Sequence, residues 1–360
     1  MYSRMRILAA FASVAIAAGG RAEGVTEGLK TGTPELKSAG ALAFGPAGLL
    51  FVADPQAAAI FAIATGDTTA PAGEAKAAKT EKLDDQIAAL LGTTADQILV
   101  NDMKVNPASG QVYFSIARGK GPGAAAVIVR VAADGSKVTE FALKEVPFSK
   151  VSIGNASDKN RTASVTSMSF VKNRLLVSGL SNEEWAANLR SIAFPFSEVD
   201  KGAGVQIFHG AHGKFETQSP IQTFTAVDIA GQTHLLASYV CTPLVKIPLD
   251  QIKSGEKVKG TTVAELGNRN RPLDIITYSK DGKEYALMAN SARGVMKVDL
   301  TGVDKIEAIT SPVKQETAGL SYETIKTLDG TVQLDKSGKD MAVVLRKAGK
   351  NLTLEVLPLP

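Results

Sequence analysis

Short apolar runs separated by polar turns recur along the whole chain. Each copy of the pattern holds three such runs, and Gly or Asp commonly occupies the turns between them. Six copies can be recognised, at residues 40–64, 101–135, 166–196, 222–249, 271–300 and 331–359. Runs of this length between turn residues are typical of β-strands, and fourth strands are expected at 136–143, 204–209 and 261–266. Self-similar units of four short strands predict an all-β fold, the six-bladed β-propeller.

Two segments interrupt this pattern with the features of short helices. Residues 80–97 carry apolar side chains at helical spacing, with Thr80 as the expected N-cap and Gly92 as the expected stop. Residues 181–189 begin with a capping residue followed by acidic residues, which favour a helix N-terminus. The sixth copy lacks a fourth strand, and we expect residues 25–30 to supply it and close the ring. The fold is therefore expected to be a propeller with two short helical insertions.

The first copy has the clearest family pattern. Its sequence LAFGPAGLLFVADPQAAAIFAI resembles the six-bladed propellers of the NHL and SMP-30 (gluconolactonase-like) type, in which F-x-P-x-G-x-L-[YF]-V-[AS]-D forms two inner strands of a blade. The resemblance covers residues 40–64 well and the other copies weakly. It therefore supports the fold more than any activity, because one fold hosts many functions.

The lactonase-like members of that group bind a divalent metal through a Glu, two Asn and an Asp around the central tunnel. The resemblance implies four analogues here, which are Asn101, Asp102, Asn270 and Asn290. The glutamate of that set has no counterpart, because Ala39 and Gly40 precede the first inner strand.

The first residues predict export. Residues 1–22 combine a basic start, a short apolar run and small residues before an expected cleavage site, which is typical of a secretory signal peptide. Without this segment the chain carries 37 basic and 36 acidic residues, so nothing indicates nucleic-acid binding. A single cysteine cannot form an internal disulfide. We expect a periplasmic or secreted monomer with one propeller domain over residues 23–360 and no membrane span.

All three histidines and the only cysteine lie within residues 208–245. In a propeller, the loops before the first strand and between the second and third strands of each blade share one face, here called the top face. His209, His212 and Cys241 are expected on that face, whereas His234 begins a second strand and belongs to the opposite face. His-x-x-His with a cysteine is a ligand set for a zinc or copper ion. The alternative is a glycine-rich loop with two solvated histidines and a buried cysteine.

Other top-face loops supply candidate ligand-binding residues. Arginines are notable because the guanidinium group suits carboxylates and phosphates. Residues of the inner strands are expected to ring the tunnel mouth, namely Asp102, Thr166, Gln222 and Arg271. The full set of candidates is Asp102, Arg118, Tyr239, Asn270, Arg271, Asn290 and Arg293. We expect a small molecule or a protein to bind there.

Three functional classes remain open from the sequence. The first is an exported propeller that binds a ligand or partner on its top face without catalysis. The second is a metal-dependent hydrolase of the lactonase type, and the third is a copper- or zinc-binding protein for redox chemistry or metal handling. The sequence lacks the Gly-x-Ser-x-Gly, Cys-x-x-Cys and His-Glu-x-x-His motifs, so no motif of those enzyme classes favours catalysis.

Overall fold

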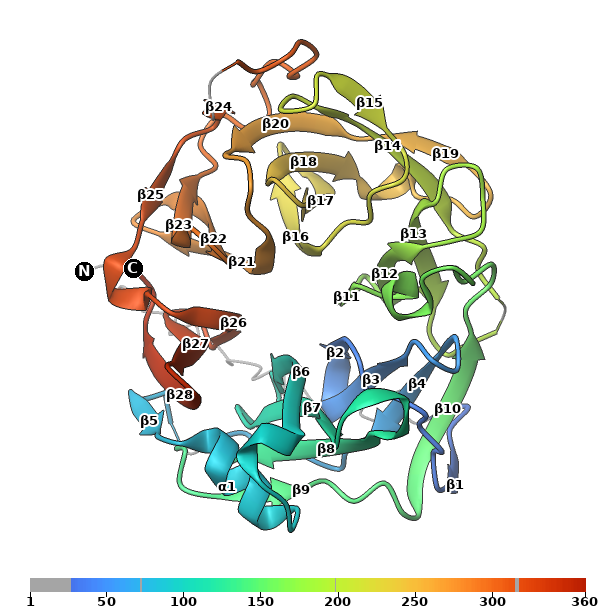
Figure 1. Ribbon diagram of the computed structural model, residues 1–360, viewed down its shortest axis with the longest axis vertical. Coiled ribbons are helices and arrows are strands. Elements are labelled where there is room, and N and C mark those ends of the chain that lie inside the picture. The colour runs from blue at the N-terminus through green and yellow to red at the C-terminus, as the bar shows by residue number, and fades with distance from the viewer. Residues whose placement is uncertain (1–26, 72, 198, 315–316) are drawn as a thin grey trace, which may run out of the picture.

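The computed structural model describes residues 27–71, 73–197, 199–314 and 317–360, and the predicted signal peptide lies outside these ranges. Six sheets, antiparallel apart from one parallel strand pair, stand around a central axis, each with its first strand innermost (Figure 1). The prediction of an all-β, six-bladed propeller is therefore confirmed.

Each blade takes three consecutive strands from one copy of the sequence pattern. Blades 1 and 2 contain β2 (Leu42–Phe44), β3 (Leu49–Asp54) and β4 (Ala59–Ala64), then β6 (Ile98–Val105), β7 (Val112–Arg118) and β8 (Ala125–Val131). Blades 3 and 4 contain β11 (Ser167–Val171), β12 (Arg174–Leu180) and β13 (Ala187–Ala193), then β16 (Thr223–Ile229), β17 (Gln232–Ser238) and β18 (Pro243–Pro248). Blades 5 and 6 contain β21 (Pro272–Lys280), β22 (Lys283–Asn290) and β23 (Gly294–Asp299), then β26 (Thr331–Ser337), β27 (Met341–Ala348) and β28 (Asn351–Pro358).

Outer strands complete the sheets and come from more distant parts of the chain. They are β10 (Val146–Ser152) and β1 (Lys30–Gly32) in blade 1, β9 (Val138–Glu140) in blade 2, β14 (Ala203–His209), β15 (Lys214–Glu216) and β19 (Lys257–Lys259) in blade 3, β20 (Thr261–Leu266) and β24 (Thr317–Gly319) in blade 4, β25 (Tyr322–Thr324) in blade 5, and β5 (Ala78–Thr80) in blade 6. The fourth strands expected at 136–143, 204–209 and 261–266 are thus confirmed as β9, β14 and β20.

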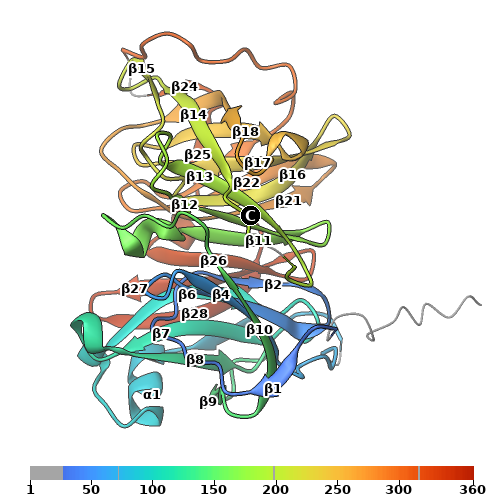
Figure 2. The same cartoon turned by 90° about the vertical axis from the view of Figure 1, so that its right-hand side faces the viewer.

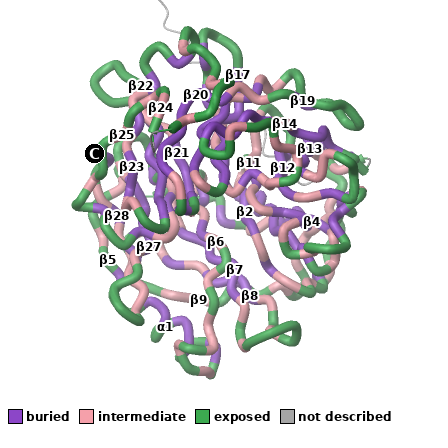
Figure 3. Tube along the Cα trace, turned by 45° about the horizontal axis from the view of Figure 1, so that its top comes forward, coloured by how far each residue is buried: buried purple, intermediate pink, exposed green. Residues whose placement is uncertain are grey.

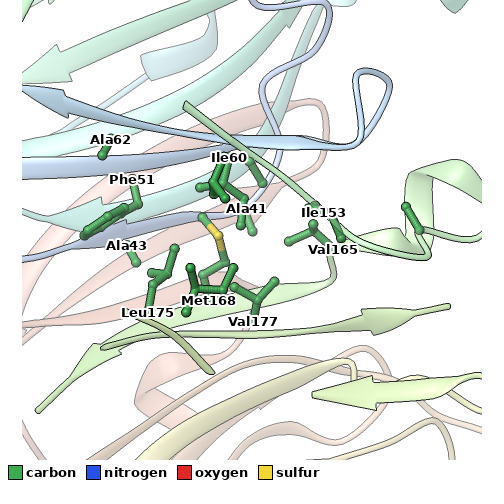
Figure 4. Packing of buried hydrophobic residues seen from close by; sticks show 14 of the residues in the cluster. Ala41, Ala43, Phe51, Ile60, Ala62, Ile153, Val165, Met168, Leu175 and Val177 are labelled. Carbon is green, nitrogen blue, oxygen red and sulfur yellow. The ribbon is translucent and has the colours of Figure 1, made fainter. Parts of the chain in front are cut away.

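The order of blades around the ring differs from their order in the chain. Each pair of neighbouring blades shares an apolar core. Blade 1 packs against blades 2 and 3, and blade 2 packs against blade 6. Blade 6 packs against blade 5, blade 5 against blade 4, and blade 4 against blade 3. Figure 4 shows the core between blades 1 and 3, where Phe51 and Met168 meet. The ring therefore runs 2-1-3-4-5-6, and blade 6 closes onto blade 2.

Two crossing strands produce this order. After β4 the chain passes blade 2 and adds β5 to the edge of β28, with Thr80 opposite Leu354. After β9 it returns to blade 1, where β10 pairs with β4 and β1 pairs with β10. The expectation that residues 25–30 close the sixth blade is wrong, because β5 already occupies that edge. Figure 2 shows the outer strands β1, β9 and β10 on the flank of these blades.

Local signals predict one helix correctly and one wrongly. Helix α1 (Leu83–Leu90) forms and stops at Gly92, whose φ of 64° allows the left-handed turn. Thr80 is not its N-cap, because it ends β5 and its hydroxyl donates to the Gly135 carbonyl oxygen at 2.9 Å. Residues 181–189 do not form a helix, since Ala187 already begins β13 and pairs with β12. In this blade, strand pairing overrides the local preference for a helix.

The remaining helical pieces are short turns, and their positions are Pro46–Gly48, Ala95–Gln97, Gly121–Gly123, Arg161–Ser164, Leu249–Gln251 and Lys326–Leu328. Central strands such as β3 are buried along their whole length, because each blade packs between two neighbours. Exposure is concentrated in the connecting loops (Figure 3). Among the described residues no helix has the length and apolarity needed to cross a membrane.

Candidate metal centre

Two imidazole rings are brought together by the hairpin of β14 and β15. His209 is the last residue of β14, and His212 lies in the turn, where its N–H donates to the His209 carbonyl oxygen at 3.1 Å. Gly210 is required at this turn, because a Cβ there would lie 2.7 Å from Cγ2 of Val313. The two ring centroids are 3.9 Å apart. The hairpin therefore presents both histidines as one unit.

One carboxylate orients both rings. Oε2 of Glu216 lies 3.0 Å from Nδ1 of His209, and Oε1 lies 2.7 Å from Nδ1 of His212. Burial works to raise the pKa of Glu216, but the hydrogen bonds from both histidines hold that pKa below its ordinary value. A carboxylate only accepts hydrogen bonds, so each Nδ1 carries the hydrogen and each Nε2 keeps a free lone pair. This carboxylate–histidine arrangement is typical of the groups behind metal-binding imidazoles.

The thiol comes from blade 4. Cys241 lies in the β17–β18 loop with a φ of 62°, and its N–H donates to the Asn270 carbonyl oxygen at 2.9 Å. This tight loop turns the cysteine toward the hairpin of blade 3. One ligand atom from each of His209, His212 and Cys241 lies within 4.8 Å of the others. The structure therefore brings together the three residues that the sequence singled out.

A fifth side chain, which sequence reasoning missed, adjoins this group. Glu265 of β20 is 1% exposed, and its Oε1 accepts the Gly210 N–H at 2.5 Å. Burial raises the pKa of Glu265 to about 7. Its Oε2 and the Nε2 of His209 are buried without a hydrogen-bond partner in the described part of the chain. Buried polar atoms are normally paired, so two unpaired atoms at one place make this cluster a candidate binding site.

The cluster of His209, His212, Cys241, Glu216 and Glu265 is here called the rim site. It lies away from the tunnel. The sequence suggested that His209 lies in a loop before an inner strand. In the structure it is instead the last residue of β14, an outer strand of blade 3. The β14–β15 hairpin lies over β20, the fourth strand of blade 4 (Figure 1). His212 is 47% exposed at its side chain, so the site is open to solvent on one side. His234 lies at the other end of β17 from Cys241, and its Nδ1 lies 2.9 Å from the Gln232 carbonyl oxygen.

The tunnel mouth on the top face is a separate cavity of about 680 Å³. Asp102, Thr166, Gln222 and Arg271 all line it, as expected for inner-strand positions. Of the four residues suggested by the lactonase resemblance, Asn101 and Asp102 line this cavity. The other two are buried and bonded to one another, with Asn290 Nδ2 donating to Asn270 Oδ1 at 2.8 Å. The lactonase-like ligand set is therefore not assembled at the mouth.

Other predicted ligand-binding residues serve the protein itself. Tyr239 is 1% exposed in the core between blades 3 and 4, and burial raises the pKa of its phenol well above the ordinary value. Arg118 donates to the Leu91 carbonyl oxygen at 3.2 Å, which ties α1 to blade 2. Arg293 packs under Gly267, where a Cβ would lie 2.3 Å from its Cζ. Asp102 and Arg271 remain as the candidates facing the tunnel cavity.

The tunnel floor holds a charged group that the sequence analysis did not identify. Nζ of Lys104 lies 3.5 Å from Asp274 Oδ2 and 3.9 Å from Asp102 Oδ1. Burial raises the pKa of both carboxyls, that of Asp274 to about 6. Lys104 and Asp335 also line a second cavity of about 850 Å³ on the opposite face. These four residues, here called the tunnel cluster, therefore separate the two cavities.

The three carboxylates of the tunnel cluster link neighbouring inner strands. Each accepts a backbone N–H from the next blade, and the pairs are Asp274 with Leu334 at 3.1 Å, Asp335 with Val105 at 2.7 Å, and Asp102 with Leu42 at 2.7 Å. The sequence signal for this arrangement is an aspartate inside the inner strands β6, β21 and β26. The cluster joins blades 5, 6, 2 and 1 in ring order.

Comparison with known proteins finds only distant structural likenesses. No protein-family model matches the chain, and no curated protein matches it. Solved structures with a similar arrangement include a chain of the mitotic checkpoint complex, at 10% identity and a TM-score of 0.39 over 99% of both chains. They also include Drosophila semaphorin 1b, at 12% identity and 0.41 over 92% of this chain and 87% of that one. A putative glucose dehydrogenase from Thermus matches at 11% identity and 0.30, over 92% of this chain and 100% of that chain. Such distant likenesses carry no functional argument.

Proposed function

We propose that this protein is a β-propeller that binds one transition-metal ion, zinc or copper, at the rim site. The observation that carries the proposal is the shared carboxylate. Glu216 fixes His209 and His212 so that their free nitrogens point away from it, and Cys241 contributes a thiol within 4.8 Å. Metal bonds to such ligands are about 2.0–2.3 Å long, so small side-chain movements suffice to close the site.

Metal handling fits the surroundings better than hydrolysis. The half-exposed His212 leaves the ion accessible, while the two large cavities lie at the tunnel and are lined by other residues. The hydrolase of the lactonase type finds less support, because Asn270 and Asn290 are buried and bonded to one another and do not line the cavity that Asp102 lines. Binding of a small molecule or protein at the tunnel mouth remains a separate proposal, centred on Asp102 and Arg271.

The proposed setting is the periplasm or the cell exterior. Its support is the signal-like sequence of residues 1–22. A lone thiol in an oxidising compartment is exposed to oxidation, and coordination by a metal together with two imidazoles protects it.

Metal loading of the purified protein tests the proposal. Wild-type protein incubated with zinc, or with copper(I) under anaerobic conditions, should retain one ion after gel filtration. The double variant His209→Ala/His212→Ala should retain less than a tenth of this amount, because removal of two ligands lowers affinity by more than about 100-fold. A thiol reagent should label Cys241 of the apo protein quickly and the loaded protein slowly. Equal metal retention by wild type and double variant would exclude the rim site.

A further inference from the structure

Glu265 lies between the two segments that carry the metal ligands. Its Oε1 accepts the N–H of Gly210, which directly follows His209. The next residue of β20, Leu266, donates its N–H to the carbonyl oxygen of Thr242, which directly follows Cys241. The same short stretch of strand therefore contacts both the hairpin of blade 3 and the cysteine loop of blade 4. This places the Glu265 carboxyl group beside the rim site.

The second oxygen of Glu265 has no hydrogen-bond partner among the described residues. Oε2 is buried, whereas Oε1 is bonded to the Gly210 N–H. A buried carboxylate oxygen is normally hydrogen-bonded, ion-paired or bound to a metal. Because the hairpin and β20 exclude water from it, a cation at the rim site is the partner best placed to satisfy it.

Glu216 and Glu265 differ in a way that assigns their roles. Both oxygens of Glu216 already accept from the imidazole Nδ1 atoms, so this residue orients ligands and has no free oxygen. Glu265 uses one oxygen for the backbone and keeps the other free. Only Glu265 can therefore give an oxygen to the ion without releasing a histidine.

We propose that Glu265 is the fourth ligand and that the rim site is a four-coordinate zinc site of two histidines, one cysteine and one glutamate. The proposal rests on the proposed function and adds the fourth donor and the identity of the ion. Zinc accepts nitrogen, sulfur and carboxylate oxygen in a tetrahedral site, whereas copper(I) prefers thiolate and imidazole. On binding, the Cys241 thiol loses its proton to solvent, and the two imidazoles bind as neutral groups.

Coordination by Glu265 requires a small rearrangement. Its oxygens are not in the group of ligand atoms within 4.8 Å of one another, so a side-chain torsion must bring Oε2 inward. The bound ion would then connect the β14–β15 hairpin of blade 3 to the Cys241 loop and β20 of blade 4.

Zinc and copper(I) titrations of full-length wild-type protein and Glu265→Gln test the proposal. The amide keeps an acceptor for Gly210 and removes the anionic oxygen, so the variant should fold. Its zinc Kd should rise by about 10–100-fold, while its copper(I) Kd should stay within about twofold of wild type. The exposed Glu256→Gln serves as the matched control and should leave both constants unchanged.

Cobalt(II) spectra provide a second readout. The wild type should give the intense visible bands of a tetrahedral site with one thiolate, and Glu265→Gln should shift them as water replaces the carboxylate. If Glu265→Gln does not fold, Glu265→Asp replaces it, because the shorter side chain cannot reach both Gly210 and the ion.

The possible results separate the two proposals. A wild type that binds no zinc would overturn both. Zinc binding that depends on His209 and His212 but has the same Kd in Glu265→Gln would overturn only the fourth ligand. An equal loss of zinc and copper(I) affinity would overturn the selectivity for zinc.

Discussion

The rim site and the tunnel cluster are both groups of ionisable side chains between blades, yet their bonding differs. In the tunnel cluster, Asp102, Asp274 and Asp335 each accept a backbone N–H from the next blade, and Lys104 lies among them. At the rim site, the Nε2 of His209 and the Oε2 of Glu265 have no hydrogen-bond partner within the described ranges. The charged groups of the tunnel cluster therefore satisfy one another and link neighbouring blades, whereas the rim site keeps two unpaired polar atoms, as expected for the metal site that we propose.

This difference is instructive because perturbed pKa values occur in both places. Burial raises the pKa of Asp274 to about 6 and that of Glu265 to about 7. Such shifts mark functional sites as well as structural ion pairs. Hydrogen-bond satisfaction separates the two cases here, and it favours the rim site as the place where an external partner binds.

The largest expected effect is on stability and comes from the tunnel cluster. Lys104→Met leaves the three carboxylates without their cation, and removing one partner of a buried ion pair typically costs about 3–5 kcal/mol. Urea unfolding at pH 7 should show a loss of this size, with zinc affinity within twofold of wild type. A loss below about 1 kcal/mol would mean that the cluster does not hold the inner strands together.

The second effect concerns only the rim site. Cys241→Ser replaces a soft thiolate by a hydroxyl and should raise the zinc Kd by about 100-fold, or about 2.8 kcal/mol. In the presence of a chelator, the free energy of unfolding should match that of wild type within about 0.5 kcal/mol. Wild-type affinity in this variant would remove the cysteine from the site.

A third prediction concerns the pH dependence of the tunnel cluster. The folded-state pKa of Asp274 is raised to about 6 from an ordinary 3.8, so the folded protein binds a proton that the unfolded chain has lost. The free energy of unfolding should therefore fall by roughly 2 kcal/mol as pH rises from about 4 to about 6. Asp274→Asn should flatten this slope in denaturant titrations across that range. An unchanged slope would assign the effect to other groups.

The smallest effect is expected at the third histidine. His234 lies at the opposite end of β17 from Cys241 and already contacts the Gln232 carbonyl oxygen. His234→Gln should leave the zinc Kd within about twofold of wild type in the same titration. A tenfold loss of zinc affinity would show that His234 also takes part in metal binding and that the rim site is defined by the wrong residues.

Strands were predictable from the sequence, but their arrangement around the ring was not. Alternation between apolar runs and turn residues is local, so all six copies were recognised. The order 2-1-3-4-5-6 depends on where β5 and β10 pair, and β5 is only three residues long. A pairing that short leaves no periodic signal. The wrong helix at 181–189 has a similar origin, because β13 is fixed by its partner β12 rather than by local preference.

The rim site was found because its histidines and cysteine are scarce in the chain, and for the same reason its two glutamates were missed. Three histidines and one cysteine in 360 residues make a cluster conspicuous. Glu216 and Glu265 belong to an abundant residue type, and their roles depend on contacts across the hairpin and between blades. At the tunnel mouth, the prediction was based on position in the fold. The places of Asp102 and Arg271 at or near the inner strands predicted that they line the cavity, but Lys104 was not identified.

X-ray absorption at the zinc edge of the zinc-loaded wild-type protein tests the central claim most directly. The account predicts one sulfur at about 2.3 Å and three nitrogen or oxygen neighbours at about 2.0–2.1 Å, two of them with the outer-shell scattering of imidazole. The sulfur shell should vanish in Cys241→Ser. A wild-type spectrum with only oxygen and nitrogen neighbours and no sulfur would contradict the proposed metal site.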